Sequence, residues 1–387
     1  MVAPEKKDAI ETKVIHAGEP EERPAGAVVL PIHQSATFEY GGQADYHDLK
    51  YIRLNNTPNH NALHKKLASL ENAEAALVTS SGMSAISTSL LTFLGSGDHL
   101  LAQRTLYGGT HSFVTHDIGK WGVSHSLIDL NSPEEWEGVL RPKTKVIYLE
   151  SISNPLMEVF DLHKVVDFAE RHNLVSMIDN TFASPFNFRP PEIGFDLSLH
   201  SCTKYLNGHS DIVAGAVIGK SEHVEKVSHL LDHLGGSLDP HACFLLQRGI
   251  KTLAVRMKQH NISGQALAEF LERHPAIKEV NYPGLKSNSQ HSFASSLFDG
   301  FSGMLSFEPA GGLEAAKRFI NKAKFPISAP SLGGVETLMT RPCTTSHSGM
   351  SKEERAETRI SDSLIRISVG IEAVEDLMAD FDQAFSD

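Results

Sequence analysis

The stretch "TKVIYLES" (residues 144–151) is a short apolar run with the composition of a buried strand. It is followed by "LHKVVDFAERHN" (162–173), whose apolar residues recur at helical spacing, and by a second apolar run, "LVSMIDN" (174–180). Apolar runs of this kind are typical of parallel strands that are buried on both faces of a sheet. The stretch therefore predicts a β-α-β unit of an α/β fold.

The alternation begins earlier in the chain. The strand-like "AALVTS" (75–80) leads into a helical segment at 81–95, and "DHLLAQ" (98–103) returns to strand. After residue 240 the pattern changes to a long helical region and then to a mixture of strands and helices. We expect an α/β chain in three parts: an irregular N-terminal arm at 1–58, a large domain with a mainly parallel sheet at 59–245, and a smaller α+β domain at 246–387.

Composition narrows the class of protein. The net charge is -12, with 47 acidic and 35 basic residues. The sequence contains no Lys/Arg-rich run, which argues against a nucleic-acid partner. The three cysteines are far apart and contain no CxxC pair, which favours a reducing compartment. The N-terminus lacks the apolar core of a signal peptide, and no run is long enough to cross a membrane. We predict a globular, soluble, cytoplasmic protein that binds no membrane.

Motifs for P-loops, dinucleotide-binding folds and serine hydrolases are absent from the sequence. Candidate sites therefore lie at the carboxyl edge of the predicted sheet, where open α/β folds bind ligands. The first is "TSSGMSA" (79–85), where Gly82 lets the backbone approach a ligand and the start of a helix offers free N–H groups to an anion. A helix start capped by a serine explains the same residues without a ligand.

The second position is Asp179, which ends the apolar run of "SMIDNTF". A carboxylate with little solvent around it requires a cationic partner, and the protonated nitrogen of a pyridine ring would serve. The alternative is an aspartate that caps the following turn.

The third position is "HSCTK" (200–204). If this segment is extended, Ser201 and Thr203 lie on one face and could bind a phosphate, and Lys204 follows where the chain turns. A lysine with a lowered pKa can form a Schiff base, although most lysines are solvated surface groups. An anion cradle, a pyridine partner and an amine occur in the order along the chain that pyridoxal 5'-phosphate (PLP) requires.

A metal site is a further possibility, because His60 and His64 in "HNALH" would share one face of a helix. This pair lacks the adjacent glutamate of a zinc protease. We interpret the two residues as ordinary histidines of a helix surface and predict no metal.

The chain resembles the trans-sulfuration enzymes of cysteine and methionine metabolism. These are fold type I PLP-dependent proteins that include cystathionine γ-synthase, cystathionine γ- and β-lyases and methionine γ-lyase. The resemblance covers nearly the whole chain and is carried by "YIRLNNTP", "SSGMSAIS", "LYGGT", "ESISNP", "IDNTF", "SCTKYLNGHSD", "SLGGVET" and "LIRISVGIE", in the order of the family.

The resemblance implies roles for individual residues. Lys204 would form the Schiff base and move protons, Asp179 would pair with the ring nitrogen, and Tyr107 would stack on the ring as a candidate acid or base. The phosphate would be held by Gly82, Met83, Ser201 and Thr203, together with Tyr51 and Arg53 of a neighbouring subunit, and Tyr51 would also act in catalysis. Asn154 would reach the 3-oxygen of the ring, and Ser331, Arg366 and Asn154 would bind the substrate. A homo-oligomer follows, commonly a dimer of dimers (a homotetramer).

The implied activity is elimination or γ-replacement on a sulfur-containing or O-acylated L-amino acid. We expect a carbon–sulfur lyase or γ-replacement transferase, with cystathionine β-lyase and methionine γ-lyase, another fold type I enzyme such as an aminotransferase, and a non-catalytic homologue as alternatives. Three positions depart from the family pattern: Pro330 replaces a common glutamate, Ser112 replaces an arginine, and Gly109 replaces the cysteine of methionine γ-lyases. "NNTP" also replaces the usual "NPT". The substrate therefore stays open.

Overall fold

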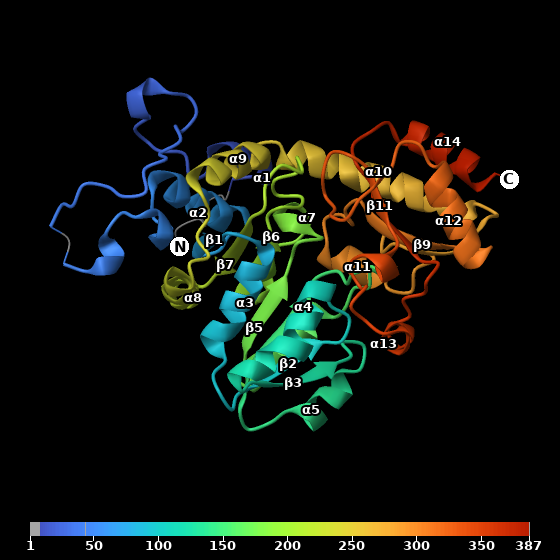
Figure 1. Cartoon of the computed structure of the whole chain (residues 1–387), viewed down its shortest axis with the longest axis horizontal. Coiled ribbons are helices and arrows are strands. Elements are labelled where there is room, and N and C mark those ends of the chain that lie inside the picture. Colours follow the sequence, from blue (N-terminus) through green and yellow to red (C-terminus); the bar gives the residue numbers. More distant parts are fainter. Residues whose placement is uncertain (1–7, 43, 387) are drawn as a thin grey trace, which may run out of the picture.

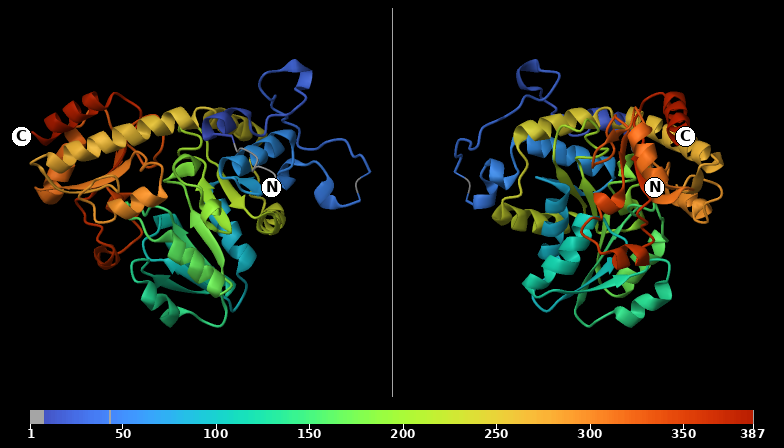
Figure 2. Two further views of the ribbon diagram at one scale, coloured as in Figure 1. Left: turned by 180° about the vertical axis from the view of Figure 1, so that it is seen from behind. Right: turned by 45° about the vertical axis from the view of Figure 1, so that its right-hand side comes forward.

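The computed structural model describes residues 8–42 and 44–386. Residues 1–7, which belong to the predicted arm, lie outside the described residues. Figures 1 and 2 show a large α/β part, a smaller part that contains the C-terminus, and an N-terminal segment that projects from the large part. The long helix α10 (Leu253–Arg273) runs from the large part to the small one. Within the described ranges, no helix is long and apolar enough to cross a membrane.

The large part is built on a seven-stranded sheet with the order β1-β7-β6-β5-β4-β2-β3. All neighbours from β6 to β3 are parallel, whereas β7 runs antiparallel to both β1 and β6. This agrees with the predicted, mainly parallel sheet. The strands are β1 (Ala75–Thr79), β2 (His99–Gln103), β3 (Ser124–Ile128), β4 (Thr144–Glu150), β5 (Val175–Asp179), β6 (Leu197–Ser201) and β7 (Gly215–Gly219).

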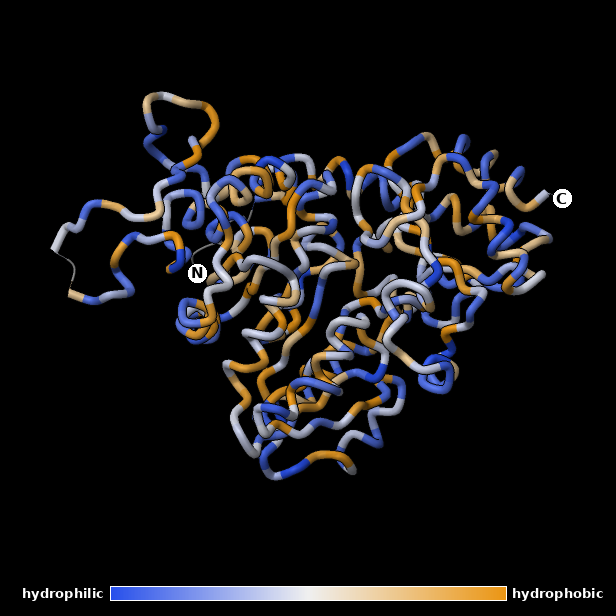
Figure 3. The backbone as a smooth tube through the Cα atoms, in the orientation of Figure 1, coloured by the Kyte–Doolittle hydropathy of each residue, from blue (hydrophilic) through white to orange (hydrophobic). Residues whose placement is uncertain are grey.

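Both faces of this sheet are buried, as the continuous apolar runs predict. In β4, Ile147 and Leu149 pack into one core cluster, while Val146 and Tyr148 pack into a second cluster on the opposite face. Figure 3 shows the hydrophobic colour concentrated on these central segments, while the outlying helix α13 (Lys352–Glu357) is hydrophilic. The other helices of the large part are α2 (Pro58–Leu70), α3 (Gly82–Phe93), α4 (Gly108–Ser112), α5 (Trp136–Val139), α6 (Leu162–Arg171), α7 (Ser184–Asn187), α8 (Ser221–Leu234) and α9 (Pro240–Ile250).

The smaller part contains a five-stranded sheet with the order β10-β11-β12-β9-β8. Its own core cluster includes Phe307, Phe319 and Phe381, all fully buried. Its strands are β8 (Ile277–Asn281), β9 (Met304–Pro309), β10 (Ile327–Ser328), β11 (Leu338–Thr340) and β12 (Ile365–Ser368), and its helices include α11 (His291–Leu297), α12 (Gly312–Lys322) and α14 (Val374–Phe385). The α+β character of this region agrees with the prediction. The predicted boundary at residue 245 falls inside α9 and stays a prediction.

The N-terminal region is not wholly irregular, since it contains the helix α1 (Ile10–His16), which packs beside α2. After α1 the chain leaves the body of the molecule, as the blue segment shows in all views of Figures 1 and 2. Several large apolar side chains of this segment are exposed, among them Val28 and Tyr40.

Two local expectations are corrected by the structure. His60 is fully buried and not on the surface, because its ring bridges Thr57 Oγ1 and the carbonyl oxygen of Leu238. The strand expected at 200–204 already ends at Ser201 in β6, and the next residues form turns. Among the described residues, no group of three or more His, Cys, Asp or Glu side chains is arranged to hold a metal ion.

Candidate active site

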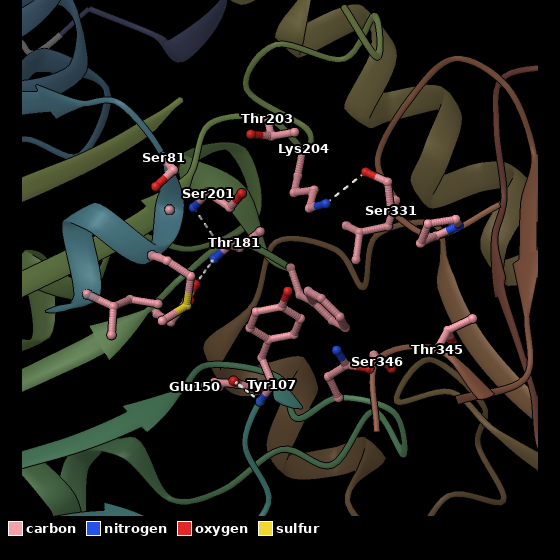
Figure 4. A pocket seen from close by; sticks show the side chains of 18 of the residues that line it. Ser81, Tyr107, Glu150, Thr181, Ser201, Thr203, Lys204, Ser331, Thr345 and Ser346 are labelled. Atoms are coloured by element: carbon pink, nitrogen blue, oxygen red, sulfur yellow. Dashed lines mark hydrogen bonds between the residues drawn. The ribbon is translucent and has the colours of Figure 1, made fainter. Parts of the chain in front are cut away.

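A cavity of about 730 Å³ lies between the carboxyl ends of the large sheet's parallel strands and segments of the small part. Figure 4 shows side chains from both parts pointing into it. Ten of the residues proposed from the sequence line this cavity: Gly82, Met83, Tyr107, Asn154, Asp179, Ser201, Thr203, Lys204, Ser331 and Arg366. Segments far apart in the sequence therefore converge on one site.

The anion cradle follows β1, where the chain turns into α3. Ser81 is the N-cap of α3, and its hydroxyl accepts a hydrogen bond from the Ser84 N–H at 3.0 Å. The capped helix start is therefore present, and the same helix N-terminus faces the cavity. A Cβ atom on Gly82 would lie 2.8 Å from Ser201 Cβ, so a side chain at residue 82 would fill the gap between α3 and the end of β6.

Ser201 and Thr203 reach the cavity by a route that differs from the expected extended strand. The Ser201 N–H donates to Thr181 Oγ1 at 2.8 Å, and the Thr203 hydroxyl exchanges hydrogen bonds with the backbone of Ala214 at 3.1 and 3.3 Å. Both hydroxyls therefore reach the cavity because the chain turns after β6, and not because they alternate along an extended strand.

Asp179 ends β5 and lines the cavity. Its carboxylate accepts a hydrogen bond from the Thr181 N–H at 2.9 Å, so the turn-capping interpretation also holds. Burial raises the pKa of Asp179, and hydrogen bonds from Thr181 and the nearby Lys204 oppose that rise. A cation in the cavity would favour the charged form of this carboxyl group and relieve the cost of its burial.

Lys204 points into the cavity, and its Nζ donates a hydrogen bond to Ser331 Oγ at 2.7 Å (Figure 4). Burial and, second, the neighbouring charge of Arg366 lower the pKa of Lys204 to about 8, while Asp179 acts in the opposite direction. An amine with this pKa is partly neutral close to physiological pH and can act as a nucleophile or a base.

Arg366 lies in β12 and is 5% exposed, which is unusual for a guanidinium. Its Nη1 donates to Asn154 Oδ1 at 3.0 Å and its Nη2 to the Ser331 carbonyl oxygen at 3.2 Å. Burial lowers the pKa of Arg366 to about 10. Both hydrogen-bond acceptors are neutral, so this buried cation is well suited to bind a carboxylate in the cavity.

Tyr107 precedes α4 and is 42% exposed, with its ring in the cavity. Its N–H donates to Glu150 Oε1 at 2.5 Å. A Cβ atom on Gly109 would lie 2.7 Å from the Tyr107 ring, so the absence of a side chain at residue 109 makes room for that ring. The departure at Gly109 thus has a local packing reason.

Tyr51 and Arg53 are the two proposed residues that the structure does not bring to the cavity of this chain. Arg53 Nη1 donates to the carbonyl oxygen of Asp232 at 2.7 Å, near the end of α8, and the guanidinium lies over the Tyr46 and Tyr51 rings. Tyr51 is 37% exposed on the projecting segment.

Several cavity residues were missed by the sequence reasoning. Glu150 ends a predicted strand beside Asp179, and that position could have identified it. No sequence signal pointed to the segment at 344–346, which belongs to an irregular region of the small part. The missed lining residues are Ser81, Ile86, Glu150, Ile152, Thr181, Phe182, Val213, Leu332, Thr344, Thr345 and Ser346.

The residues present fit the cofactor that the resemblance implies. The space that a Cβ atom at residue 82 would fill is next to backbone N–H groups, which suit a phosphate. Asp179 offers a carboxylate to a ring N–H, and Lys204 offers an amine of lowered pKa to an aldehyde. The donor set therefore has the anion, cation and amine partners that PLP requires.

Comparison with known proteins extends this description. The family model for Cys/Met metabolism PLP-dependent enzymes matches residues 11–386. An L-methionine gamma-lyase of Porphyromonas gingivalis is 42% identical over 380 residues, which cover 95% of each chain. A cystathionine beta-lyase of Lactococcus lactis subsp. cremoris is 40% identical over 97% of this chain and 98% of its own length. The crystal structure of cystathionine gamma-lyase from Lactobacillus plantarum complexed with L-serine superimposes with a TM-score of 0.93 at 35% identity and covers 98% of both chains.

Proposed function

The chain belongs to the PLP-dependent enzymes of cysteine and methionine metabolism, and we propose that it eliminates a thiol from an L-amino acid with an uncharged sulfur-containing side chain. It is a PLP-dependent carbon–sulfur lyase by family. The observation that carries the substrate preference is the distribution of charge in the cavity, and the proposed roles of individual residues support the reaction.

The cofactor would be held by the large part of the chain. When bound, PLP supplies an aldehyde that bonds to an amine and a ring that withdraws electrons from the substrate's α-carbon. Lys204 would hold the aldehyde carbon, and Asp179 would keep the ring nitrogen protonated. The N–H groups of Gly82 and Met83 and the hydroxyls of Ser201 and Thr203 would bind the phosphate, the ring of Tyr107 would stack on the cofactor, and Asn154 would reach its 3-oxygen.

The substrate would be oriented by its α-carboxylate. Arg366 would make a bidentate pair with it, and its hydrogen bonds to Asn154 and to the Ser331 carbonyl fix the plane of the guanidinium. Lys204 Nζ lies 2.7 Å from Ser331 Oγ, so the amine is next to the place where that carboxylate would bind. Lys204, once released by the substrate amine, would remove the α-proton at Nζ, and Tyr107 would act as a second acid or base.

Each acidic or basic residue that the structure describes in the cavity already has a partner or a proposed role, so none of them is left to bind a charge on the substrate side chain. The acidic and basic residues among the described lining are Glu150, Asp179, Lys204 and Arg366. The last three have the roles given above, and Glu150 binds the backbone of Tyr107. Apart from the amide of Asn154, the rest of the lining is apolar or carries hydroxyl groups, including Val213, Pro330, Leu332, Thr344, Thr345 and Ser346. A distal carboxylate or ammonium would lose its hydration without gaining a partner.

A side-by-side assay tests this preference. With L-methionine we expect the carbon–sulfur bond to break with uptake of water, giving methanethiol, ammonia and 2-oxobutanoate. L-homocysteine should react likewise. L-cystathionine and O-succinyl-L-homoserine, which carry distal charges, should have at least about a tenfold lower kcat/KM, since one unpaired buried charge costs more than 1.4 kcal/mol.

The opposite order of substrates would contradict the proposal and favour cystathionine β-lyase or a γ-replacement enzyme. O-acetyl-L-homoserine with a thiol acceptor tests γ-replacement directly. Amino transfer to a 2-oxo acid without release of ammonia would identify an aminotransferase, and a lack of any turnover by cofactor-loaded protein would identify a non-catalytic homologue.

We further propose that the chain works as a homo-oligomer, a dimer of dimers, in which Tyr51 and Arg53 reach the cofactor phosphate of a neighbouring subunit. The projecting segment with its exposed apolar residues supports this assembly. An inactive Arg53→Ala protein mixed with an inactive Lys204→Ala protein should regain activity if sites are shared. A monomeric mass in solution would contradict the assembly.

The division into an arm at 1–58, a large domain at 59–245 and a small domain at 246–387 is also a proposal, as is a cytoplasmic location. The location is supported by the three cysteines, which are all buried and free. Limited proteolysis and cell fractionation test the two statements.

A further inference from the structure

Glu150 has no role in the reaction described above, yet it lies at the centre of the site. It is the last residue of β4, and in the parallel register it is the direct neighbour of Asp179, the last residue of β5. It is 5% exposed and lines the cavity. Two carboxyl groups therefore end neighbouring strands under the same cofactor site.

The Glu150 carboxyl group fixes the backbone on the side of the cavity where Tyr107 lies. Its Oε1 accepts the hydrogen bond from the Tyr107 N–H at 2.5 Å (Figure 4), and the backbone N–H of Asn154 also bonds to this carboxyl group. The Glu150 N–H in turn donates to Gln103 Oε1 at 2.9 Å, which ties the end of β4 to the end of β2. Tyr107 begins α4 without a side-chain cap of its own. Its position thus depends on Glu150.

Adjacent buried carboxyl groups do not both ionise, because each negative charge raises the pKa of the other. Asp179 has the environment that favours the charge: hydrogen bonds from Thr181, with Lys204 and His200 nearby. Burial and the charge of Asp179 raise the pKa of Glu150 well above the ordinary value, and they outweigh the backbone hydrogen bonds from Tyr107 and Asn154, which act to lower it. The buried hydroxyl of Tyr148 lies near both and stays protonated for the same reasons.

We propose that Glu150 is a positioning residue that stays protonated during the reaction, holds Tyr107 in place through its carbonyl oxygen, and leaves Asp179 as the single negative charge available to the cofactor ring. This inference deepens the proposed function and rests on it for the roles of Tyr107 and Asp179. The protonation of Glu150 itself can be measured without turnover.

The first test is the charge of Glu150 in the protein without substrate. Infrared spectra of the wild type and of Glu150→Gln are compared at about pH 7.5. The wild type should show the carbonyl band of a protonated carboxyl group, and the variant should lack it. The matched control is Glu158→Gln, because Glu158 is another largely buried glutamate whose pKa is raised by burial, but it pairs with Arg359 outside this cavity. Loss of that band in Glu158→Gln but not in Glu150→Gln would overturn the proposal.

The second test separates position from charge. Glu150→Gln keeps a carbonyl acceptor and no charge, so kcat/KM should stay within about threefold of wild type, and the pH midpoint of the cofactor's visible absorption should not move. Glu150→Ala removes the acceptor and should lower kcat by about tenfold or more, since Tyr107 loses its anchor. If Glu150 is an anion, Glu150→Gln will move the absorption midpoint to lower pH, because a cationic cofactor loses a neighbouring negative charge, and that result would refute the proposal even if Glu150→Ala fails to fold.

The two failures can be told apart. A protein that lacks lyase activity but shows the Glu150 carbonyl band would refute the proposed function and keep the protonation of Glu150. An active lyase without that band would keep the proposed function and refute the protonation of Glu150.

Discussion

The two walls of the cavity are built in different ways. The cofactor-facing wall comes from the large sheet, where Gly82, Asp179 and Ser201 lie at or just after the ends of strands. The substrate-facing wall comes from the small part, where Arg366 is in a strand, but Ser331 lies in a loop and the segment at 344–346 lies at the end of a short 3-10 helix and in the turn after it. The first wall is fixed by a buried sheet, whereas the second depends on how loops rest against it. We expect substrate choice to depend on the second wall.

Loss of the central amine is the strongest way to break the first wall. We expect Lys204→Ala to lower kcat by more than about 10³-fold, because the variant loses both the covalent hold on the cofactor and the group that moves the proton. Stopped assays of 2-oxo acid release measure the effect, and the exposed residue Lys226 gives a control variant, Lys226→Ala, that should behave as wild type. Retained activity in Lys204→Ala would refute the assigned site.

Removal of the buried guanidinium breaks the second wall. Arg366→Ala should lower kcat/KM by about a hundredfold, or roughly 3 kcal/mol, since a bidentate charged pair with the substrate carboxylate is lost. Cofactor absorption should persist because the first wall is intact. Arg359→Ala is the control, as Arg359 is an exposed arginine of the same part. An unchanged kcat/KM in Arg366→Ala would show that the carboxylate binds elsewhere.

The coupling between the walls can be read from the pH dependence of cofactor loading. Lys204 must be neutral to attack the aldehyde, and its pKa is lowered to about 8 by burial and by Arg366. The rate of loading into cofactor-free protein should therefore rise with pH with a midpoint near pH 8, about two units below that of an ordinary lysine. In Arg366→Ala the midpoint should move to higher pH, because a neighbouring positive charge is removed. A midpoint above pH 10 in wild type would contradict this account.

The smallest expected effect concerns the packing of Gly109 against the Tyr107 ring. Gly109→Ala should displace the Tyr107 ring, since the added Cβ would lie 2.7 Å from it, and lower kcat by about threefold to tenfold. Gly119→Ala is the matched control, because a Cβ atom at residue 119 meets nothing within 4 Å. Equal kinetics of the two variants would show that the position of Tyr107 does not limit turnover.

The contrast between the walls also explains what the sequence could predict. Alternating apolar runs located the strands, and the residues after them, such as Gly82 and Asp179, follow from the rule that ligands bind at strand ends. Thr344, Thr345 and Ser346 lie at the end of a single 3-10 turn and just after it, too short a stretch to show periodicity, so only the three-dimensional fold brings them to the site. The roles of Arg366 and Ser331 came from the resemblance and not from the pattern, because an arginine in a strand is more often a surface residue.

Errors arose where tertiary contacts overrode local pattern. The run at 200–204 has the alternation of a strand, but the chain turns after Ser201 and the backbone of Ala214 binds Thr203 instead. His60 has the spacing of a helix-surface residue, but it is buried and its ring hydrogen-bonds to the carbonyl oxygen of Leu238. The sequence pattern did not predict the antiparallel strand β7, because its apolar run, "GAVIG", is short and carries nothing that indicates its direction in the sheet.

The position of β7 has a consequence for how the chain acquires its fold during synthesis. β1 lies at the edge of the large sheet and has β7 as its strand neighbour there, although the two are far apart in the chain. During translation β1 therefore cannot pair with β7 until residues 215–219 have left the ribosome. Closing so long a loop is slow, because its conformational entropy is lost before the pairing compensates for it. The cradle that follows β1 is completed only with that late step, so a nascent chain truncated before β7 should lack the phosphate pocket.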